Sequence, residues 1–107
     1  MGLYRFMRMM VMFDLPVGTA KERSVARKFV KFLKDNGFVM FQESIYVKLC
    51  INETSAKSTE KIIKTHLPPQ GLVSSLTLTE TQFNSITYML GDFQTDVITT
   101  DDRVIEL

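Results

Sequence analysis

The apolar run Met-Met-Val-Met-Phe at residues 9–13, followed at once by Asp14, constrains the fold of this chain more than any other feature. Successive side chains of a strand point to opposite faces of its sheet. A strand without polar alternation is therefore expected to be covered on both faces. A charge is costly to bury beside so much hydrocarbon unless it is paired or binds a cation. Asp14 thus marks either the turn that ends the strand or a cation site.

Length and composition favour one small intracellular domain. The 107 residues are enough for a single core. One cysteine excludes an internal disulfide, and one cysteine with one histidine cannot form a structural zinc site. The apolar stretch after Arg5 and Arg8 stops at Asp14, so it is too short for a signal peptide or a membrane span. We expect the protein to reside in the cytoplasm.

Apolar periodicity and chain breaks predict an α+β fold with the order strand, helix, strand, strand, helix, strand. The expected strands are residues 6–13, 38–41, 44–51 and 71–79, and the expected helices are residues 20–36 and about 58–66 with a polar lead-in from 52. Thr19 and Glu22 have capping-box spacing at the start of the first helix, so this helix does not need Asp14 as its cap. Asn36-Gly37 is a typical helix stop. The order is that of a ferredoxin-like βαββαβ sandwich.

Both helices of such a fold lie on one face of the sheet, and the opposite face is usually polar in a monomer. Met10 and Met12 contradict that expectation in the first strand. A two-fold homodimer that packs through the sheet faces is the simplest cover.

The C-terminal part of the chain is expected to extend this core within a single domain. We assign residues 1–80 to the ferredoxin-like core and residues 81–107 to an extension with an acidic tail. A short helix or turn is expected near 80–84, an extra strand at 86–90 and a small edge strand at 104–105. The extra strand can extend a sheet edge of its own chain or of a partner.

The net charge of +1 conceals a strong asymmetry. Residues 21–36 contain six basic and two acidic side chains, whereas residues 80–107 contain one basic and six acidic side chains. This asymmetry suggests two different partners. The basic residues of the first helix are Lys21, Arg23, Arg27, Lys28, Lys31 and Lys34.

A solvated helix face is the usual explanation of such residues, and it stays open here. The excess of cations with little i,i+4 pairing favours contacts to a phosphate backbone. Without interleaved aromatic residues, the pattern suits non-specific duplex contacts better than base reading. An RNA-recognition module on the same topology would need a stacked aromatic segment that this chain lacks.

Asp14 is the best candidate for a metal ligand. Mg²⁺ prefers hard oxygen ligands and is often held by one or two carboxylates with water and phosphate oxygens. One carboxylate per chain is too few for a well-defined site, but two copies of Asp14 could share an ion near a dimer axis. The alternative is a turn-initiating aspartate before Leu15-Pro16.

In order and spacing, these residues resemble the small CRISPR-associated endoribonuclease family, the dimeric subunit of the spacer-acquisition complex. The resemblance covers about residues 4–90, and the sequence is especially similar to members from type II loci. It rests on the strand ending in Phe13-Asp14, on the basic helix with Arg23, Arg27 and Lys28, and on Gly37-Phe38 with the segment 42–46. That segment, Gln-Glu-Ser-Ile-Tyr, looks like the family's Gln-x-Ser-Val-Phe-type segment.

The resemblance implies a homodimer that bridges two dimers of a larger integrase subunit. Their complex would capture short duplex DNA and insert it into the CRISPR array, with the integration chemistry in the larger subunit. The resemblance also implies that Asp14 is the catalytic, Mg²⁺-binding residue of an endonuclease. Met40-Phe41 stand where basic residues are common in the family, which weakens any nucleic-acid contact expected from the second strand.

Two functions therefore compete. The leading hypothesis is a structural DNA-binding subunit of the adaptation complex, whose basic helices hold duplex DNA and whose acidic tail docks the integrase subunit. The alternative is a metal-dependent endoribonuclease or duplex DNA nuclease that uses paired Asp14 residues across the dimer.

Overall fold

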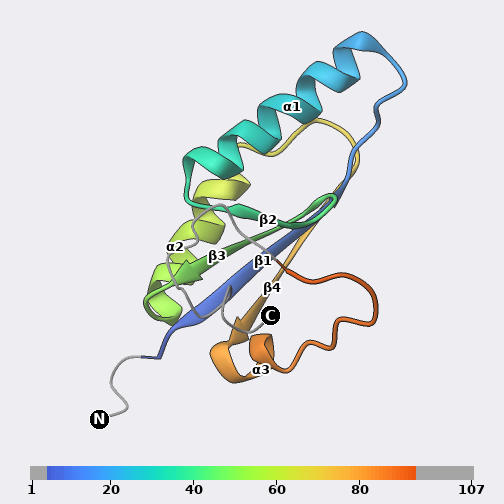
Figure 1. The fold of residues 1–107 in the computed structure, drawn as a ribbon. Coiled ribbons are helices and arrows are strands. Elements are labelled where there is room, and N and C mark those ends of the chain that lie inside the picture. Colours follow the sequence, from blue (N-terminus) through green and yellow to red (C-terminus); the bar gives the residue numbers. More distant parts are fainter. Residues whose placement is uncertain (1–4, 94–107) are drawn as a thin grey trace.

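Strand β1 (Met7–Asp14) is the centre of the sheet in residues 5–93, the part of the chain that the computed structural model describes. It pairs antiparallel with β3 (Ile45–Cys50) on one side and with β4 (Leu72–Thr79) on the other. β2 (Val39–Gln42) adds to β3, which gives the strand order β2-β3-β1-β4 (Figure 1). The predicted α+β class and the ferredoxin-like order of strands and helices are confirmed.

Helix α1 (Ala20–Asp35) begins as its local sequence predicts. The Thr19 hydroxyl accepts a hydrogen bond from the backbone N–H of Glu22, and the Glu22 carboxylate accepts one from the backbone N–H of Thr19, both at 3.0 Å. Together they satisfy two N–H groups that the helix itself leaves unpaired. At the other end Gly37 has a φ of +93°, a conformation that glycine adopts without steric cost.

Helix α2 (Glu53–Lys64) has a simpler cap, begins within the expected polar lead-in and ends two residues earlier than expected. The side-chain oxygen of Asn52 accepts a hydrogen bond from the backbone N–H of Ser55 at 2.7 Å.

No helix among residues 5–93 is long and apolar enough to cross a membrane.

The main core lies between the sheet and the two helices. Phe13 of β1 packs edge-on against Phe29 of α1 at 5.3 Å and stacks on Tyr46 of β3 at 5.8 Å. The buried members of this core are Met9, Val11, Phe29, Leu33, Phe38, Tyr46, Cys50, Ala56 and Ile63.

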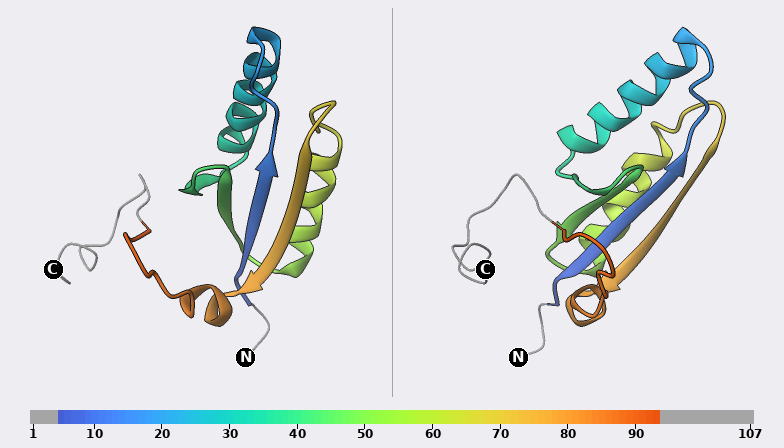
Figure 2. Two further views of the ribbon diagram at one scale, coloured as in Figure 1. Left: turned by 90° about the vertical axis from the view of Figure 1, so that its right-hand side faces the viewer. Right: turned by 45° about the vertical axis from the view of Figure 1, so that its right-hand side comes forward.

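A second, smaller core covers the opposite face of the sheet. Met10 of β1 and Val47 of β3 are buried there beneath Phe83 and Phe93. Phe83 belongs to the short helix α3 (Glu80–Asn84), and the chain that follows it lies on the side of the sheet opposite α2 (Figure 2). The sequence predicted that this face needs a cover, and part of that cover comes from the chain's own C-terminal segment.

The extra strand expected at 86–90 is not formed, which corrects the sequence-based prediction. These residues follow α3 as irregular chain, and Met89 and Leu90 are 93% and 97% exposed. A strand needs the backbone of a neighbour for its hydrogen bonds, and this segment pairs with neither edge of the sheet. The edge strand expected at 104–105 lies outside the described residues.

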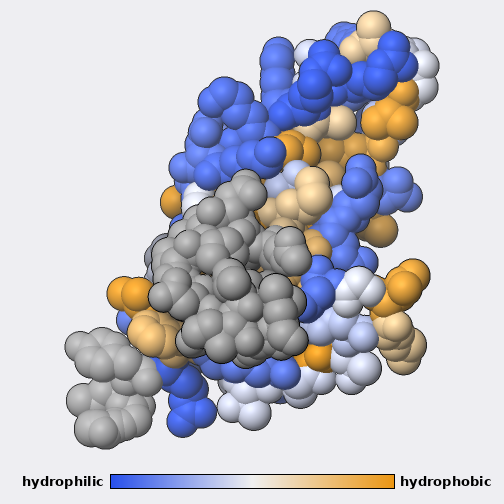
Figure 3. Space-filling model, in the orientation of Figure 1, coloured by the Kyte–Doolittle hydropathy of each residue, from blue (hydrophilic) through white to orange (hydrophobic). Residues whose placement is uncertain are grey.

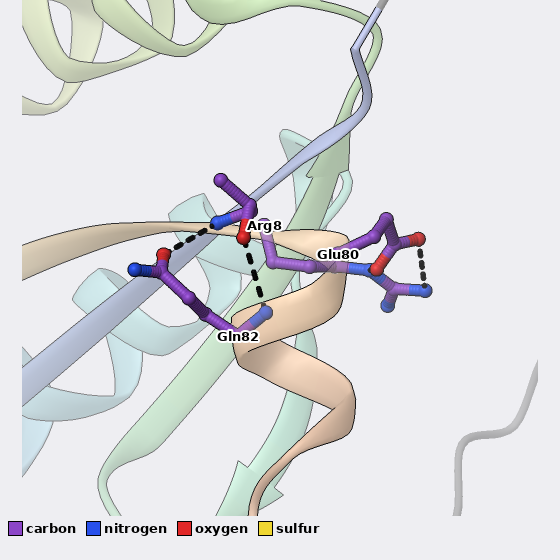
Figure 4. Close-up of polar contacts among 4 residues, drawn as sticks. Arg8, Glu80 and Gln82 are labelled. Atoms are coloured by element: carbon purple, nitrogen blue, oxygen red, sulfur yellow. Dashed lines mark hydrogen bonds and ion pairs between the residues drawn. The ribbon is translucent and has the colours of Figure 1, made fainter.

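An ion pair joins α3 to the central strand. The Arg8 guanidinium donates to both carboxylate oxygens of Glu80 at 3.0 and 3.2 Å, and it lies 4.7 Å from the centre of the Phe83 ring. Figure 4 shows this pair beside the cap of α3, in which the side-chain oxygen of Gln82 accepts a hydrogen bond from the backbone N–H of Thr79. Arg8 therefore fixes the start of the segment that covers the second face.

We predict that Arg8→Met lowers the free energy of unfolding by about 1–2 kcal/mol, because a forked charged hydrogen bond and a cation–π contact are lost together. Urea unfolding monitored by circular dichroism measures the change. The control is Lys31→Met, which removes a solvent-exposed pair with Asp35 and should cost only about 0.3–0.5 kcal/mol. Equal losses in the two variants would contradict the role given to Arg8.

The turn between β2 and β3 holds a strained residue. Ser44 has a φ of +64°, the only positive value at a non-glycine residue within 5–93. Its carbonyl accepts a hydrogen bond from the backbone N–H of Phe13 at 3.0 Å, so the turn is fixed against the end of β1.

Ser44→Gly is expected to raise the free energy of unfolding by about 0.5–1 kcal/mol. It relieves the left-handed conformation, and the greater freedom of glycine in the unfolded chain offsets part of that gain. The same substitution at Ser74, in the extended strand β4, should destabilise the protein instead. Thermal unfolding of both variants tests the sign, and destabilisation by Ser44→Gly would refute the strain.

Candidate functional site

Asp14 is the last residue of β1 and pairs with Leu72 of β4, so the strand itself positions it. Alternation along β1 places Asp14 on the same face as Met10 and Met12, away from α1 and α2. The residue is exposed, and within residues 5–93 its carboxylate has no hydrogen-bond or ion-pair partner. Asp14 is therefore a strand-end carboxylate that faces solvent.

Two turns hold the backbone on either side of this carboxylate. The first is the β2–β3 turn, through the hydrogen bond from Phe13 to Ser44. The second is the loop before β4, where a Cβ at Gly71 would lie only 2.6 Å from the carbonyl oxygen of Asp14. Since Gly71 also has a φ of +104°, this close approach requires glycine.

The chemistry of Asp14 fits Mg²⁺, but the number of ligands in one chain does not. A carboxylate oxygen is the kind of ligand that Mg²⁺ prefers. Within the described part of the chain, however, no three His, Cys, Asp or Glu residues come together to hold a metal ion. Any site at Asp14 needs donors from a second copy, from nucleic acid or from water.

Two buried side chains among residues 5–93 have perturbed pKa values, and neither is a candidate for catalysis. Burial raises the pKa of the Cys50 thiol, and burial together with the nearby charge of Glu43 raises the pKa of the Tyr46 hydroxyl. Both groups therefore stay neutral near pH 7, and Cys50 is the core residue that the sequence predicted.

The basic residues predicted from the sequence all lie on α1 and are all exposed. Lys31 pairs with Asp35 at 2.7 Å, and Arg23 donates to the carbonyl of Val17 at 3.0 Å. Among the residues that the structure describes, the other four basic side chains have no carboxylate partner within ion-pair distance: Lys21, Arg27, Lys28 and Lys34. The exposed face of α1 is thus a strip of largely uncompensated positive charge.

Asp14 and this strip do not form one site within the chain. α1 packs on one face of the sheet, and Asp14 lies on the other. The structure therefore separates the candidate metal ligand from the candidate phosphate-binding residues.

A groove of about 600 Å³ between α1 and the β2–β3 turn was missed by the sequence reasoning. We call it the α1 groove. Arg27, Lys31 and Lys34 line it from the helix, and Met40 lines it from β2. Met40 is 45% exposed although it is large and apolar. The sequence did contain one indication of this. Val39 and Phe41 pack on the second core, so strand alternation places Met40 on the opposite face, toward α1.

Comparison with known proteins assigns this sequence to a family. The family described as CRISPR associated protein Cas2 matches residues 7–86. A protein of Ligilactobacillus salivarius named CRISPR-associated endoribonuclease Cas2 is 48% identical over 94% of this chain and all of its own length. Relatives with the same name from Lacticaseibacillus rhamnosus and Treponema denticola are 43% and 42% identical, over 92% and 94% of this chain and 98% and 100% of their own lengths. The predicted resemblance is confirmed: the chain belongs to the CRISPR-associated Cas2 family.

Proposed function

We propose that this chain is the structural, DNA-binding subunit of a CRISPR adaptation complex. With a larger integrase subunit it captures short duplex DNA and supports its insertion into the CRISPR array as a new spacer. The observation that carries the proposal is the exposed face of α1, where five of six basic side chains have no carboxylate partner among the described residues.

The dimensions of α1 suit a duplex backbone. Arg23 and Lys34 are eleven residues apart on the helix, which corresponds to about 16 Å along its axis. A duplex presents one phosphate charge for about every 1.7 Å of its axis, so the strip can follow about five base pairs. Such contacts fix a protein on DNA without reading its sequence.

A homodimer would present two such strips, and apolar residues left exposed on the second face of the sheet support it. Leu49, Leu72 and Leu76 are 46%, 67% and 50% exposed there, and Met89 and Leu90 extend from the segment after α3. Exposed apolar patches of this kind usually mark a protein interface. The edge strand β4 also lacks charged residues, which normally protect a free edge from pairing.

The acidic tail completes the proposed assembly. Residues 94–107 lie outside the described residues, and they contain four acidic side chains and one basic side chain. We assign the tail to contacts with the larger integrase subunit, two dimers of which would flank the homodimer. When the integrase subunit holds the tail, α1 is available for duplex DNA.

A second candidate function is a Mg²⁺-dependent endonuclease acting on RNA or duplex DNA. Its support is the exposed Asp14 carboxylate on the proposed dimer face, together with relatives named endoribonuclease. When bound, Mg²⁺ would polarise the phosphate and activate water. Two Asp14 residues would hold the ion across the dimer axis, and they would orient it toward the scissile phosphate.

The double variant Arg27→Glu/Lys31→Glu should weaken binding of short duplex DNA by about 100-fold and flatten its salt dependence, because two phosphate contacts become repulsive. Fluorescence anisotropy at several salt concentrations measures both effects. The matched control is Lys57→Glu/Lys61→Glu, which changes the net charge equally on the exposed surface of α2. Similar losses in the two variants would show that only net charge matters and would contradict a binding strip on α1.

Asp14→Asn should leave spacer integration unchanged and abolish any Mg²⁺-dependent cleavage of RNA or DNA, since the two functions use different faces of the sheet. Glu60→Gln, a comparable change on the surface of α2, should alter neither. Reconstituted integration and cleavage assays with purified proteins distinguish the two proposed functions. Loss of integration in a folded Asp14→Asn dimer would overturn the structural role, and a wild type without Mg²⁺-dependent cleavage over a broad pH range would exclude the nuclease.

A further inference from the structure

We propose that the α1 groove holds residues 94–107 of the same chain, in competition with duplex DNA. The competition rests on the proposed binding of DNA to α1. Docking of the tail in the groove is independent of that proposed function. The groove, its charge and the point at which the described chain ends carry this inference.

The α1 groove combines an apolar floor with a basic rim. Phe13, Leu15, Val30 and Met40 contribute to its floor, and Figure 3 shows a hydrophobic band between the hydrophilic surface of α1 and that of the β2–β3 turn. Open apolar surface beside cations favours a ligand that supplies both aliphatic and acidic side chains.

The charges around the groove favour an acidic segment. Its cations are the exposed Arg27, Lys31 and Lys34, and its carboxylates are Asp35 and Glu43. Asp35 is already paired with Lys31, so Arg27 and Lys34 are the cations without a partner among the described residues.

Residues 94–107 have the matching composition. Their acidic residues outnumber the single basic residue, Arg103, by four to one. The segment also carries five aliphatic side chains, which are Val97, Ile98, Val104, Ile105 and Leu107. It offers the apolar groups that the floor can bury and the carboxylates that the rim can pair.

The described chain ends next to this groove. Phe93 packs on Phe41 of β2 with ring centres 4.9 Å apart, on the second face of the sheet. The neighbouring Met40 lines the groove on the other face, and β2 is an edge strand that the chain can pass around. The remaining fourteen residues can extend about 46 Å, whereas α1 is about 24 Å long.

Docking is tested in the full chain with a nitroxide on Thr100→Cys, after replacement of the buried Cys50 by alanine, and with methionine methyl groups labelled for NMR. The methyl signal of Met40 should broaden strongly. The signal of Met7 should not, because Met7 lies at the opposite end of β1 from the β2–β3 turn. High salt should reduce the effect, because screening weakens the ion pairs. An unbroadened Met40 overturns the proposal. Equal broadening of Met40 in isotope-labelled chains that carry no nitroxide, when they are mixed with spin-labelled chains, also overturns it, because the tail would then belong to a second copy.

Competition is tested by duplex DNA binding of Asp101→Asn/Asp102→Asn. If the tail occupies the groove for about four-fifths of the time, its release strengthens binding about fivefold. Glu53→Gln/Glu60→Gln on α2 changes the net charge equally and should strengthen binding less than twofold. Equal gains in both variants overturn the competition. Absence of DNA binding in every protein contradicts the proposed function instead, and the methyl broadening still decides whether the tail docks.

Discussion

The burial of β1 on both faces is the constraint on which the rest of this structure depends. β1 pairs with β3 and β4 simultaneously, so its backbone groups are satisfied on both sides. Its odd-numbered side chains then pack beneath the helices, while Met10 and Met12 require cover on the other face. Charged residues are tolerated only toward its ends, where Arg8 is paired with Glu80 and Asp14 reaches solvent.

This central strand also decides how the candidate sites are divided. Because Asp14 shares its face with the second core, it lies where two copies of the sheet would meet. α1 is held on the opposite face by Phe29 and Leu33, and this leaves its basic residues in solvent. In the proposed dimer, duplex binding and metal binding therefore use surfaces that face in different directions.

The features predicted correctly are those whose causes lie within a few residues of sequence. The Thr19–Glu22 capping box contains both partners of its hydrogen bonds, and the apolar stripe of α1 needs only one helix to be recognised. The strand expected at 86–90 failed because alternation describes side chains, whereas a strand also needs a neighbouring backbone. The sequence also did not predict that Phe93 covers the second face of the sheet. That contact joins the C-terminal segment to Phe41 of β2, which is distant in sequence.

The alternation of β2 indicates that Met40 lies on the helix face of the sheet, but it does not predict the α1 groove, which exists only where two elements face each other. Its basic rim comes from α1, and its floor comes partly from the β strands. If the tail and the duplex compete for this rim, their binding free energies are coupled. Such coupling is reciprocal. A partner that binds the tail therefore increases the affinity for DNA by a certain factor, and DNA increases the affinity for that partner by the same factor. Assembly with a tail-binding integrase subunit and capture of duplex DNA would then favour each other without direct contact between the two ligands.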